Sequence, residues 1–451
     1  MRRLASWREI LQRRGDAAAI IDGGQVYTYD RLLQRIGHWG GVLEETGIRK
    51  GEVVAIRSDY CFDAVALFFA LADLGAVAVP VISQVTEEVR KRLNLAGADW
   101  VLERHEGSFE PRRTEGGNRR HELLEKLCRR GHAGLVLFSS GSTGDPKAML
   151  HDLDVLLGVY EGKRLKPYNI LVFLTFDHIG GIDTMLRALS AGGTLTIPEA
   201  RTPEAVCRAI ADHGVDVLPV SPTFINLLLL SGLHRRYDLQ TLRIIAFGAE
   251  PMPEPLLSRI RENFPDVKLQ QKFGTSETNA IRICNEEDAL YFRIDDPNVE
   301  YRIVDGELWL KSKTQVLGYL NASMEAFTED GWFKTGDMVE TDEKGRLRIV
   351  GRQKEVINVG GEKVFPHEVE AVLLQMPEVD DVMVYGEPNS ITGEGVSADI
   401  VARGDIDRRE MKKAVRKFCK NRLDAYKIPS KINLVDTTAF GERFKKIRRK
   451  M

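Results

Sequence analysis

The chain has 451 residues, about three times the length of a typical domain, so we expect two or more domains. Hydrophobic residues make up 43% of the chain and the formal net charge is −2, a balance that excludes a disordered chain and argues against a dedicated nucleic-acid-binding protein. The five cysteines are scattered without a CxxC pair, which argues against a disulfide framework or a zinc site and favours a reducing compartment.

The N-terminal segment carries charges every few residues and lacks the apolar core of a signal peptide. The longest apolar run covers residues 61–82, and Asp63, Asp73 and Pro80 interrupt it. Such a run is typical of a buried helix followed by a strand rather than of a membrane span. We therefore expect a soluble, cytoplasmic protein.

Short β-branched runs then alternate with helical stretches. Residues 53–58 and 76–81 are predicted strands on either side of a helix at 62–74, a βαβ rhythm that indicates a parallel sheet covered by helices. Residues 106–122 contain few apolar side chains and are expected to form an exposed connection. Beyond it, we expect strands and one clear helix in the following order: strands at 134–140, 169–176 and 193–199, a helix at 203–213, and strands at 215–221 and 242–248.

The pattern changes at Tyr301. Residues 301–312 alternate around Asp305 and Gly306, which is the signal for a hairpin, and residues 345–352 form another predicted strand. The remainder, with a helix near 410–423, is typical of a small α+β module of about 100 residues. We therefore expect an α/β chain, α+β overall, with a large domain at 1–352 and a small one at 353–451.

The stretch LFSSGSTGDPKAM at residues 137–149 follows a predicted buried strand. Its Gly-Ser-Thr-Gly turn exposes successive backbone N–H groups that, with the hydroxyls, can surround phosphate oxygens, and Lys147 adds a positive charge. The Walker pattern GxxxxGK[ST] is absent, because Ala148 follows the lysine, and this disfavours an ordinary P-loop NTPase. A surface turn has a similar composition, so the loop alone does not establish a phosphate site.

Four motifs occur in a set order, namely SSGSTGDPK at 139–147, FGTSE at 273–277, GWFKTGD at 331–337 and GRQKEVINVGGEKVFPHEVE at 351–370. Together they resemble the adenylate-forming superfamily, which contains acyl-CoA synthetases, firefly luciferase and the adenylation domains of peptide synthetases. The resemblance implies a large N-terminal domain of βαβ sheets plus a distorted β-barrel, followed by a small mobile lid domain.

The resemblance also implies a reaction in two halves. A carboxylate attacks the α-phosphorus of ATP to give an acyl-adenylate and pyrophosphate, and a thiol then takes the acyl group, giving a thioester and AMP. Bringing two anions together requires charge neutralisation and positioning more than a strong base. The implied cofactors and partners are ATP, Mg²⁺, a small carboxylic acid, and CoA or the phosphopantetheine of an acyl carrier protein.

By the same resemblance, Ser276 contacts the α-phosphate and Glu277 binds Mg²⁺ as a hard oxygen ligand. Asp145 and Pro146 shape the end of the opening loop. The implied ligands of the β- and γ-phosphates are Ser139, Ser140, Gly141, Ser142, Thr143, Gly144 and Lys147.

The nucleoside contacts come from three further segments. Phe273 is implied to stack on adenine, and Asp337 to accept hydrogen bonds from the ribose hydroxyls with help from Arg352. The remaining implied nucleotide-binding residues are Gly248, Ala249, Glu250, Gly274 and Thr275.

The small domain carries the implied moving parts. Lys354 takes the hinge position, and Gly360 and Gly361 are implied to approach the thiol channel in the second half-reaction. Lys446, in the sequence KKI, takes the place of the catalytic lysine that neutralises the reacting phosphate and carboxylate. Lys445 is the competitor, because the glycine that usually precedes this lysine is missing.

The sequence TFDHIGGID at residues 175–183 admits two registers. One places His178 and Gly180 at the entrance of an acyl pocket, and the other makes Asp177 the partner of a substrate ammonium, as in amino-acid activation. The HIGG stretch favours the first. Pro366 favours CoA as acceptor, whereas a carrier protein acting in trans stays open.

Four hypotheses for the function thus remain, and the preferred one has no nucleic acid as partner. The leading hypothesis is an AMP-forming acyl-CoA synthetase acting on a fatty, aryl or amino acid. The second is an acyl- or amino-acid adenylation enzyme that loads a carrier protein in trans. A degenerate member that binds nucleotide without turnover belongs to a different class, and Glu277, Asp337, Arg352 and Lys446 argue against it. A nucleic-acid-binding protein has only the basic C-terminal tail in its favour.

Overall fold

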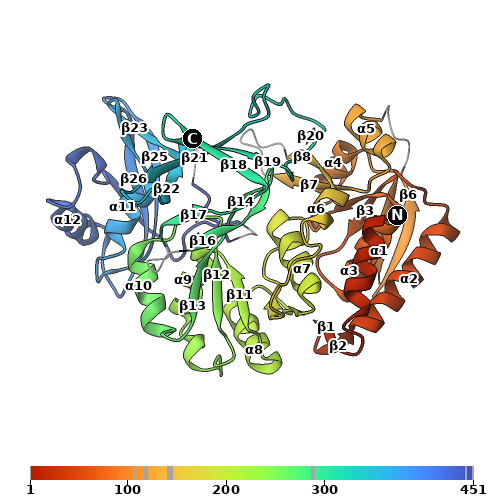
Figure 1. Cartoon of the computed structure of the whole chain (residues 1–451). Coiled ribbons are helices and arrows are strands. Elements are labelled where there is room, and N and C mark those ends of the chain that lie inside the picture. The colour runs from red at the N-terminus through yellow and green to blue at the C-terminus, as the bar shows by residue number, and fades with distance from the viewer. Residues whose placement is uncertain are drawn as a thin grey trace.

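The fold is described from a computed structural model, over residues 2–105, 107–114, 120–139, 146–285, 290–441 and 444–448. Within these ranges, a large N-terminal part contains one mostly parallel sheet, one mixed sheet and one antiparallel sheet, and a smaller C-terminal part contains a sheet of its own (Figure 1). This mixed α/β architecture, with a large part followed by a small one, confirms the expected fold class.

The first sheet has the strand order β13-β12-β11-β9-β10-β1-β2, and its neighbours run parallel except for β1 and β2. The strands of this sheet are β1 (Ala18–Asp22), β2 (Gln25–Thr28), β9 (Asn169–Leu171), β10 (Thr194–Ile197), β11 (Val217–Val220), β12 (Ile244–Phe247) and β13 (Lys268–Gln271). The helical segments that follow its strands are α7 (Ile179–Ala191), α8 (Pro203–His213), α9 (Pro222–Ser231), η1 (Leu233–Arg235) and α10 (Glu254–Asn263). The strands are shorter than the apolar runs that predicted them.

The second sheet has the order β20-β8-β7-β4-β3-β5-β6. Its strands are β3 (Val53–Arg57), β4 (Val77–Pro80), β5 (Trp100–His105), β6 (Ser108–Arg113), β7 (Gly134–Ser139), β8 (Lys147–Asp152) and β20 (Gly318–Tyr319). The helices of this region are α1 (Arg2–Gln12), α2 (Tyr29–Thr46), α3 (Phe62–Leu74), α4 (Thr86–Ala96), α5 (Glu122–Arg130) and α6 (Leu153–Gly158). The expectation of an exposed connection at 106–122 was wrong for β6, which pairs with β5 and buries Phe109.

An antiparallel sheet of order β16-β17-β22-β21-β19-β18 follows. Its strands are β16 (Ile283–Asn285), β17 (Phe292–Ile294), β18 (Val299–Val304), β19 (Glu307–Ser312), β21 (Phe333–Thr341) and β22 (Leu347–Arg352), and a separate hairpin consists of β14 (Phe273–Thr275) and β15 (Asn279–Ile281). The predicted hairpin at Asp305 and Gly306 is confirmed. Both residues have positive φ, 51° and 79°, as a two-residue turn between twisted strands requires.

The C-terminal part begins after η2 (Gln353–Glu355) and has its own apolar core, which includes Ile357, Val382 and Ile400. Its other elements are β23 (Ile357–Val359), β24 (Glu362–Val364), α11 (Pro366–Leu373), β25 (Val379–Asn389), β26 (Gly393–Ala402), α12 (Arg408–Cys419), η3 (Ala425–Lys427) and β27 (Lys431–Leu434). This separate core agrees with a small C-terminal domain. The exact boundary at residue 352 stays a prediction.

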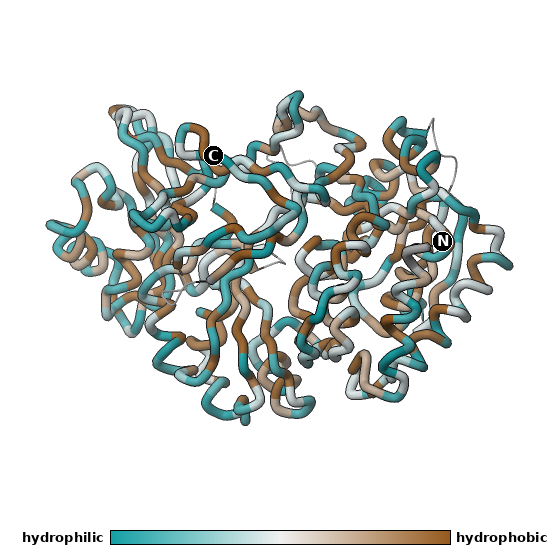
Figure 2. The backbone as a smooth tube through the Cα atoms, viewed as in Figure 1, coloured by the Kyte–Doolittle hydropathy of each residue, from teal (hydrophilic) through white to brown (hydrophobic). Residues whose placement is uncertain are grey.

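Apolar segments follow the strands and the helices packed on them, whereas many peripheral loops are polar (Figure 2). Helix α3 is apolar on all sides, and its residues from Ala64 to Ala72 are buried, as expected for a helix enclosed by other elements. In the part of the chain that the structure describes, no helix combines the length and the apolar character needed to cross a bilayer.

His151 on β8 predicts an acid-sensitive step in stability. The side chain is fully buried, and neither ring nitrogen has a hydrogen-bond partner among the described residues. Burial lowers the pKa of His151 from 6.5 to about 4, so below pH 6.5 the unfolded chain binds a proton there that the folded chain does not. The stability that depends on neutral His151 is therefore complete above pH 6.5 and falls as the pH drops towards 4.

We expect His151→Leu to remove this dependence, because leucine needs no hydrogen bond in the same apolar space. Between pH 7 and pH 5, the wild-type free energy of unfolding should fall by about 2 kcal/mol more than that of the variant. Urea unfolding at the two pH values measures the difference. Equal losses in both proteins would contradict the assignment.

Candidate functional site

A cavity of about 860 Å³ lies between α7, the β11–β13 end of the first sheet, the β14–β15 hairpin and the start of the C-terminal part. It brings together residues from all four sequence motifs and from the HIGG stretch. The predicted site residues on its wall are Ser139, Lys147, His178, Gly180, Gly248, Ala249, Phe273, Gly274, Thr275, Ser276, Glu277, Arg352 and Lys354. Ser140, Gly141, Ser142, Thr143, Gly144 and Asp145 lie outside the described residues.

His178 occupies the N-cap position of α7. Its Nδ1 accepts a hydrogen bond of 3.0 Å from the backbone N–H of Gly180, so a neutral ring carries its proton on Nε2. A side chain at position 181 would come within 2.2 Å of the carbonyl oxygen of Thr175, which explains Gly181 in this turn. The HIGG stretch thus holds the start of α7 close to the preceding loop and fixes the His178 ring on the cavity wall.

Asp177 takes a different position from its neighbour. It is 2% exposed, accepts a hydrogen bond of 2.7 Å from Thr175 Oγ1 and pairs with Arg92 at 3.1 Å. Asp177 does not form part of the cavity wall. This arrangement agrees with the register in which His178 faces the substrate and gives Asp177 a structural role.

Glu277 is held by the second sheet from across the cavity. Tyr319 on β20 donates a hydrogen bond of 3.0 Å from its hydroxyl to Glu277 Oε1, and burial together with the Glu277 charge raises the pKa of Tyr319. Lys147 Nζ lies 5.2 Å from the centroid of the Tyr319 ring. One aromatic residue thereby orients both a carboxylate and a cation of the motifs.

Asp337 and Arg352 are directly paired across β21 and β22. Arg352 Nε lies 3.0 Å from Asp337 Oδ1, and the carboxylate is 5% exposed. Burial raises the pKa of Asp337, and the charge of Arg352 opposes that rise. Arg352 reaches the cavity together with Thr335 and Gly336, whereas Asp337 lies behind that surface.

The residues predicted to contact adenine divide into a group that lines the cavity and one residue, Glu250, that points away from it. Phe273 packs against Phe292 at a centroid distance of 5.3 Å and contributes to the wall, as do Gly248 and Ala249. Glu250 points away and accepts hydrogen bonds from the Thr223 hydroxyl and from the backbone N–H of Lys446, both at 2.7 Å. Its observed contacts connect the large part to the C-terminal segment.

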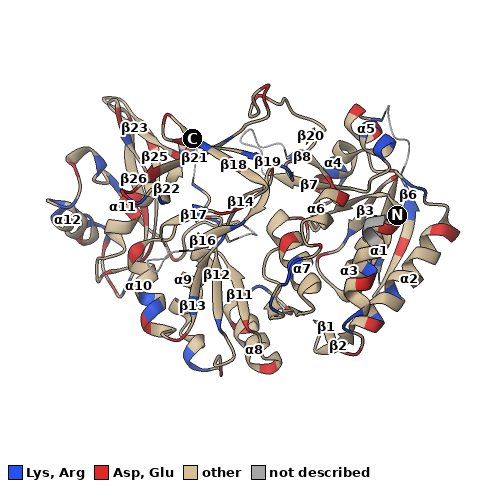
Figure 3. Cartoon of the chain, in the orientation of Figure 1, with Lys and Arg blue, Asp and Glu red and all other residues tan. Residues whose placement is uncertain are grey.

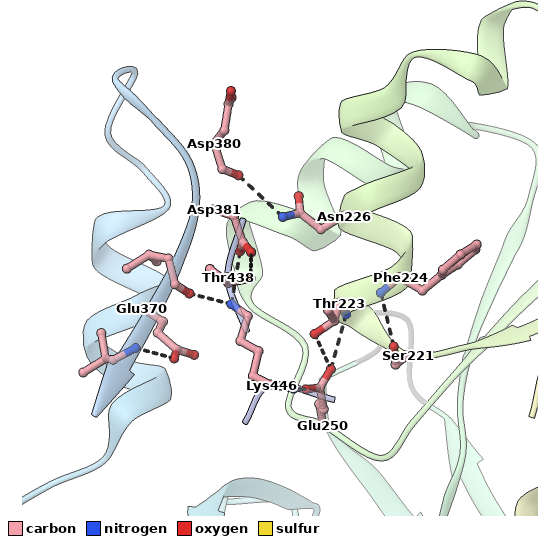
Figure 4. A network of polar contacts seen from close by, with 12 residues as sticks. Ser221, Thr223, Phe224, Asn226, Glu250, Glu370, Asp380, Asp381, Thr438 and Lys446 are labelled. Atoms are coloured by element: carbon pink, nitrogen blue, oxygen red, sulfur yellow. Dashed lines mark hydrogen bonds and ion pairs between the residues drawn. The ribbon is translucent and has the colours of Figure 1, made fainter. Parts of the chain in front are cut away.

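The two adjacent lysines near the C-terminus point to different places, and Figure 4 shows the polar contacts of Lys446. Lys446 Nζ donates hydrogen bonds to Asp381 Oδ1 at 3.1 Å and to the carbonyl oxygen of Val382 at 2.5 Å, and its side chain is 9% exposed. Lys445 lies on the cavity wall. Residue 446 pairs in a β-bridge with Phe440, and in such extended backbone consecutive side chains point to opposite sides.

The structure therefore does not bring the Lys446 amine to the cavity, in contrast to the expectation from the sequence, and it brings Lys445 there instead. Gly360 and Gly361 also lie away from the cavity, in the exposed turn between β23 and β24, where both have positive φ. Lys354 lies on η2 and reaches the wall.

Four charged or polar wall residues and supports were missed by the sequence analysis: Asp183, Arg187, Lys272 and Tyr319. Asp183 and Arg187 follow Gly180 at helical spacing, and Lys272 directly precedes the FGTSE motif. These positions were available as signals. Their location on one cavity could not be predicted, because it depends on how α7 packs against β15 and faces β13 across the cavity.

Comparisons with known proteins agree with this geometry. The family model described as AMP-binding enzyme matches residues 7–320, and the model described as AMP-binding enzyme C-terminal domain matches residues 368–440. The 4-coumarate–CoA ligase-like protein 9 of Arabidopsis thaliana is 27% identical, over 95% of this chain and 85% of that protein. A 2-succinylbenzoate–CoA ligase of Listeria monocytogenes is 27% identical, over 93% of this chain and 92% of its own.

Among solved structures, the anthranilate CoA ligase AuaEII in complex with anthranoyl-AMP superposes with a TM-score of 0.83. The superposition covers 98% of this chain and 95% of that one, at 20% sequence identity. At this identity the likeness establishes the shared fold.

The Asp337–Arg352 pair predicts a coupled effect on stability. Arg352→Gln leaves a buried carboxylate without its cation, and we expect the free energy of unfolding at pH 7 to fall by about 1–3 kcal/mol. This loss is smaller than for a fully buried ion pair, because the arginine is partly exposed to solvent. The double variant Arg352→Gln/Asp337→Asn should regain part of this loss. Urea unfolding of the four proteins in the cycle measures the coupling, and strictly additive effects would contradict it.

Proposed function

The chain belongs to the AMP-binding enzyme family, and from that premise we propose that it is an AMP-forming acid–thiol ligase. It activates a carboxylic acid with ATP, releases pyrophosphate, and transfers the acyl group to CoA. The observation that carries this proposal is the convergence of Ser139, Lys147, Ser276, Glu277 and Arg352 on one cavity.

The convergence supplies what the first half-reaction needs. A carboxylate and a triphosphate repel each other, and hydroxyls and cations from separate segments lower that repulsion where the two anions meet. Lys147 and Arg352 provide positive charge from two different sheets, while Ser139 and Ser276 provide hydroxyl donors. Because Ser139, Lys147 and Arg352 lie on strands and Ser276 lies in the turn of the β14–β15 hairpin, little reorganisation is needed at the moment of reaction.

The carboxylate of Glu277 fits a Mg²⁺ ion, which prefers hard oxygen ligands. Oε1 accepts the Tyr319 hydrogen bond, and the side chain borders the cavity, so the carboxylate is both oriented and accessible to a ligand. The ion would neutralise phosphate charge there. Tyr319 then acts as a positioning residue for Glu277.

Lys445 is the residue we assign to the reacting phosphate and carboxylate, with Lys446 as its anchor. Lys446 holds the last described segment to β25 through Asp381 and Val382, and its backbone N–H donates to Glu250. The anchored segment directs Lys445 to the cavity wall. The lid-like exchange of two faces around Lys354 is part of the same proposal and rests on the family resemblance.

CoA is the preferred acceptor because the two curated relatives described above are named as CoA ligases. A carrier protein in trans is the second candidate. Ser276 and Glu277 act in the first half-reaction in either case, so the acceptor is decided by a separate test.

The test is carboxylate-dependent ATP–pyrophosphate exchange over a panel of fatty, aromatic, dicarboxylic and amino acids, with Mg²⁺ present. We expect at least one class of acid to drive exchange, and added CoA to convert the adenylate into a thioester with release of AMP. Exchange without thioester formation on CoA would favour a carrier protein. If no class of acid drives exchange, the proposal is wrong.

The two lysines predict opposite outcomes in this assay. Lys445→Ala should lower the exchange rate by about 100-fold or more, because a preorganised cation at the reacting phosphate is lost. Lys446→Ala should lower the melting temperature, and it should reduce the exchange rate less than Lys445→Ala does. Melting temperature and exchange rate, measured on both variants, separate the roles, and the reverse pattern would return the catalytic role to Lys446.

A further inference from the structure

The cavity extends beyond the residues that the nucleotide requires, into a region between α7 and the first sheet. One face of α7 borders it, since Gly180, Asp183, Arg187 and Ala191 recur at helical spacing on the wall. Gly180 lies in the first turn of α7, and Arg187 lies about two turns further along the helix. If the nucleotide lies against the motif residues, as proposed above, this region is left for the acyl part of the substrate.

The opposite wall is the face of β11, β12 and β13, and strand register determines its chemistry. Lys268 is paired with Ile244, which is paired with Val217. The next row on the same face pairs Gln270 with Ala246 and Ala246 with Pro219. The centre of the wall is therefore apolar, whereas β13 at the sheet edge is polar.

Positive charge gathers at that polar edge. Lys272 continues the same face of β13, and its ammonium is influenced by the charges of Arg187, Lys268 and Asp183. Lys and Arg residues occur on both walls of the region, α7 and the β11–β13 sheet (Figure 3). Three cations thus face one carboxylate, and Asp183 is already engaged by the Tyr160 hydroxyl.

The Lys272 ammonium has no partner among the described residues, and Arg187 has an ion pair with Asp183 but no hydrogen bond from its Nε. The Lys272 side chain is exposed on the cavity wall, and its ammonium makes no hydrogen bond or ion pair with any described residue. Arg187 Nε lies 3.8 Å from Asp183 Oδ2, too far for a hydrogen bond, and no described residue accepts one from it. Desolvation in the cavity, and then the charge of Arg187, lower the pKa of Lys272 to about 8.

We propose that the activated acid carries a second anionic group, which Lys272 and Arg187 bind, and an apolar body that lies on Val217, Pro219, Ile244 and Ala246. The substrate class is thus a dicarboxylic acid rather than a simple fatty or monocarboxylic acid. The inference rests on the proposed ligase function. A second carboxylate near Lys272 gives the charge-assisted hydrogen bonds that the protein itself does not supply.

The experiment compares matched pairs of acids in the pyrophosphate-exchange assay, each monocarboxylic acid beside the dicarboxylic acid with the same carbon skeleton. For the best pair, we expect kcat/KM of the wild type to be about 10- to 100-fold higher for the dicarboxylic acid. Lys272→Met should abolish that preference by raising KM for the dicarboxylic acid, with kcat/KM for the monocarboxylic acid unchanged or higher.

Three further variants sharpen the test. Lys272→Arg should keep the preference, and Lys272→Glu should reverse it in favour of an acid that carries an amine. Lys413→Met, on the exposed face of α12, removes a lysine away from the cavity and should change nothing. Unchanged ATP binding by each variant, followed by calorimetry, shows that the nucleotide side of the site is intact.

The outcomes separate the two proposals. Activity on monocarboxylic acids at least equal to that on their dicarboxylic partners, or an equal loss for both in Lys272→Met, overturns the second-anion site and leaves the ligase assignment standing. Absence of exchange with every acid overturns the ligase assignment, and the substrate class falls with it.

Discussion

Electrostatic repulsion among the cations of one cavity is the constraint that determines how the side chains of the site are arranged. Among the described residues, nine Lys and Arg side chains line the cavity against two carboxylates. Like charges in a partly enclosed space raise the energy of the folded chain unless anions join them, so strands and paired partners must hold the cations apart. Arg352 is fixed by Asp337 and Lys147 lies beside the Tyr319 ring, and binding of an anionic ligand should stabilise the whole protein.

The C-terminal segment is bound to the small part by ion pairs in which each cation has its carboxylate, and to the large part by hydrogen bonds with Glu250 and Ser221. Lys446 pairs with Asp381, and Arg448 pairs with Glu355 and Glu370 at 3.0 Å each. Ser221 donates a hydrogen bond of 2.7 Å to the carbonyl oxygen of Phe444. A rotation of the small part must break or carry these contacts, so the segment sets an energetic cost on any domain rearrangement.

Local pattern predicted much of the fold, since the helix at residues 62–74 and the hairpin at Asp305 depend on nearby residues. It failed for β6, whose polar residues form an edge strand only because β5 lies beside it. The motifs brought Ser276 and Glu277 to the site region, yet one-residue alternation placed Lys445 rather than Lys446 on the wall. The convergence of Lys272 and Arg187 on one cavity depends on tertiary packing, which no single-sequence pattern encodes.

Lys272 and Phe273 are consecutive on the cavity wall, and our proposals assign the first to the acyl group and the second to the nucleotide. Substrate choice and cofactor recognition therefore share one short piece of backbone but use separate side chains. A point substitution at residue 272 can change which acid is accepted without disturbing the contact with adenine. A single-residue insertion between β13 and β14 would instead change the direction in which both side chains point. Lineages descended from this scaffold should accordingly diversify here by exchange of side chains and keep the spacing constant.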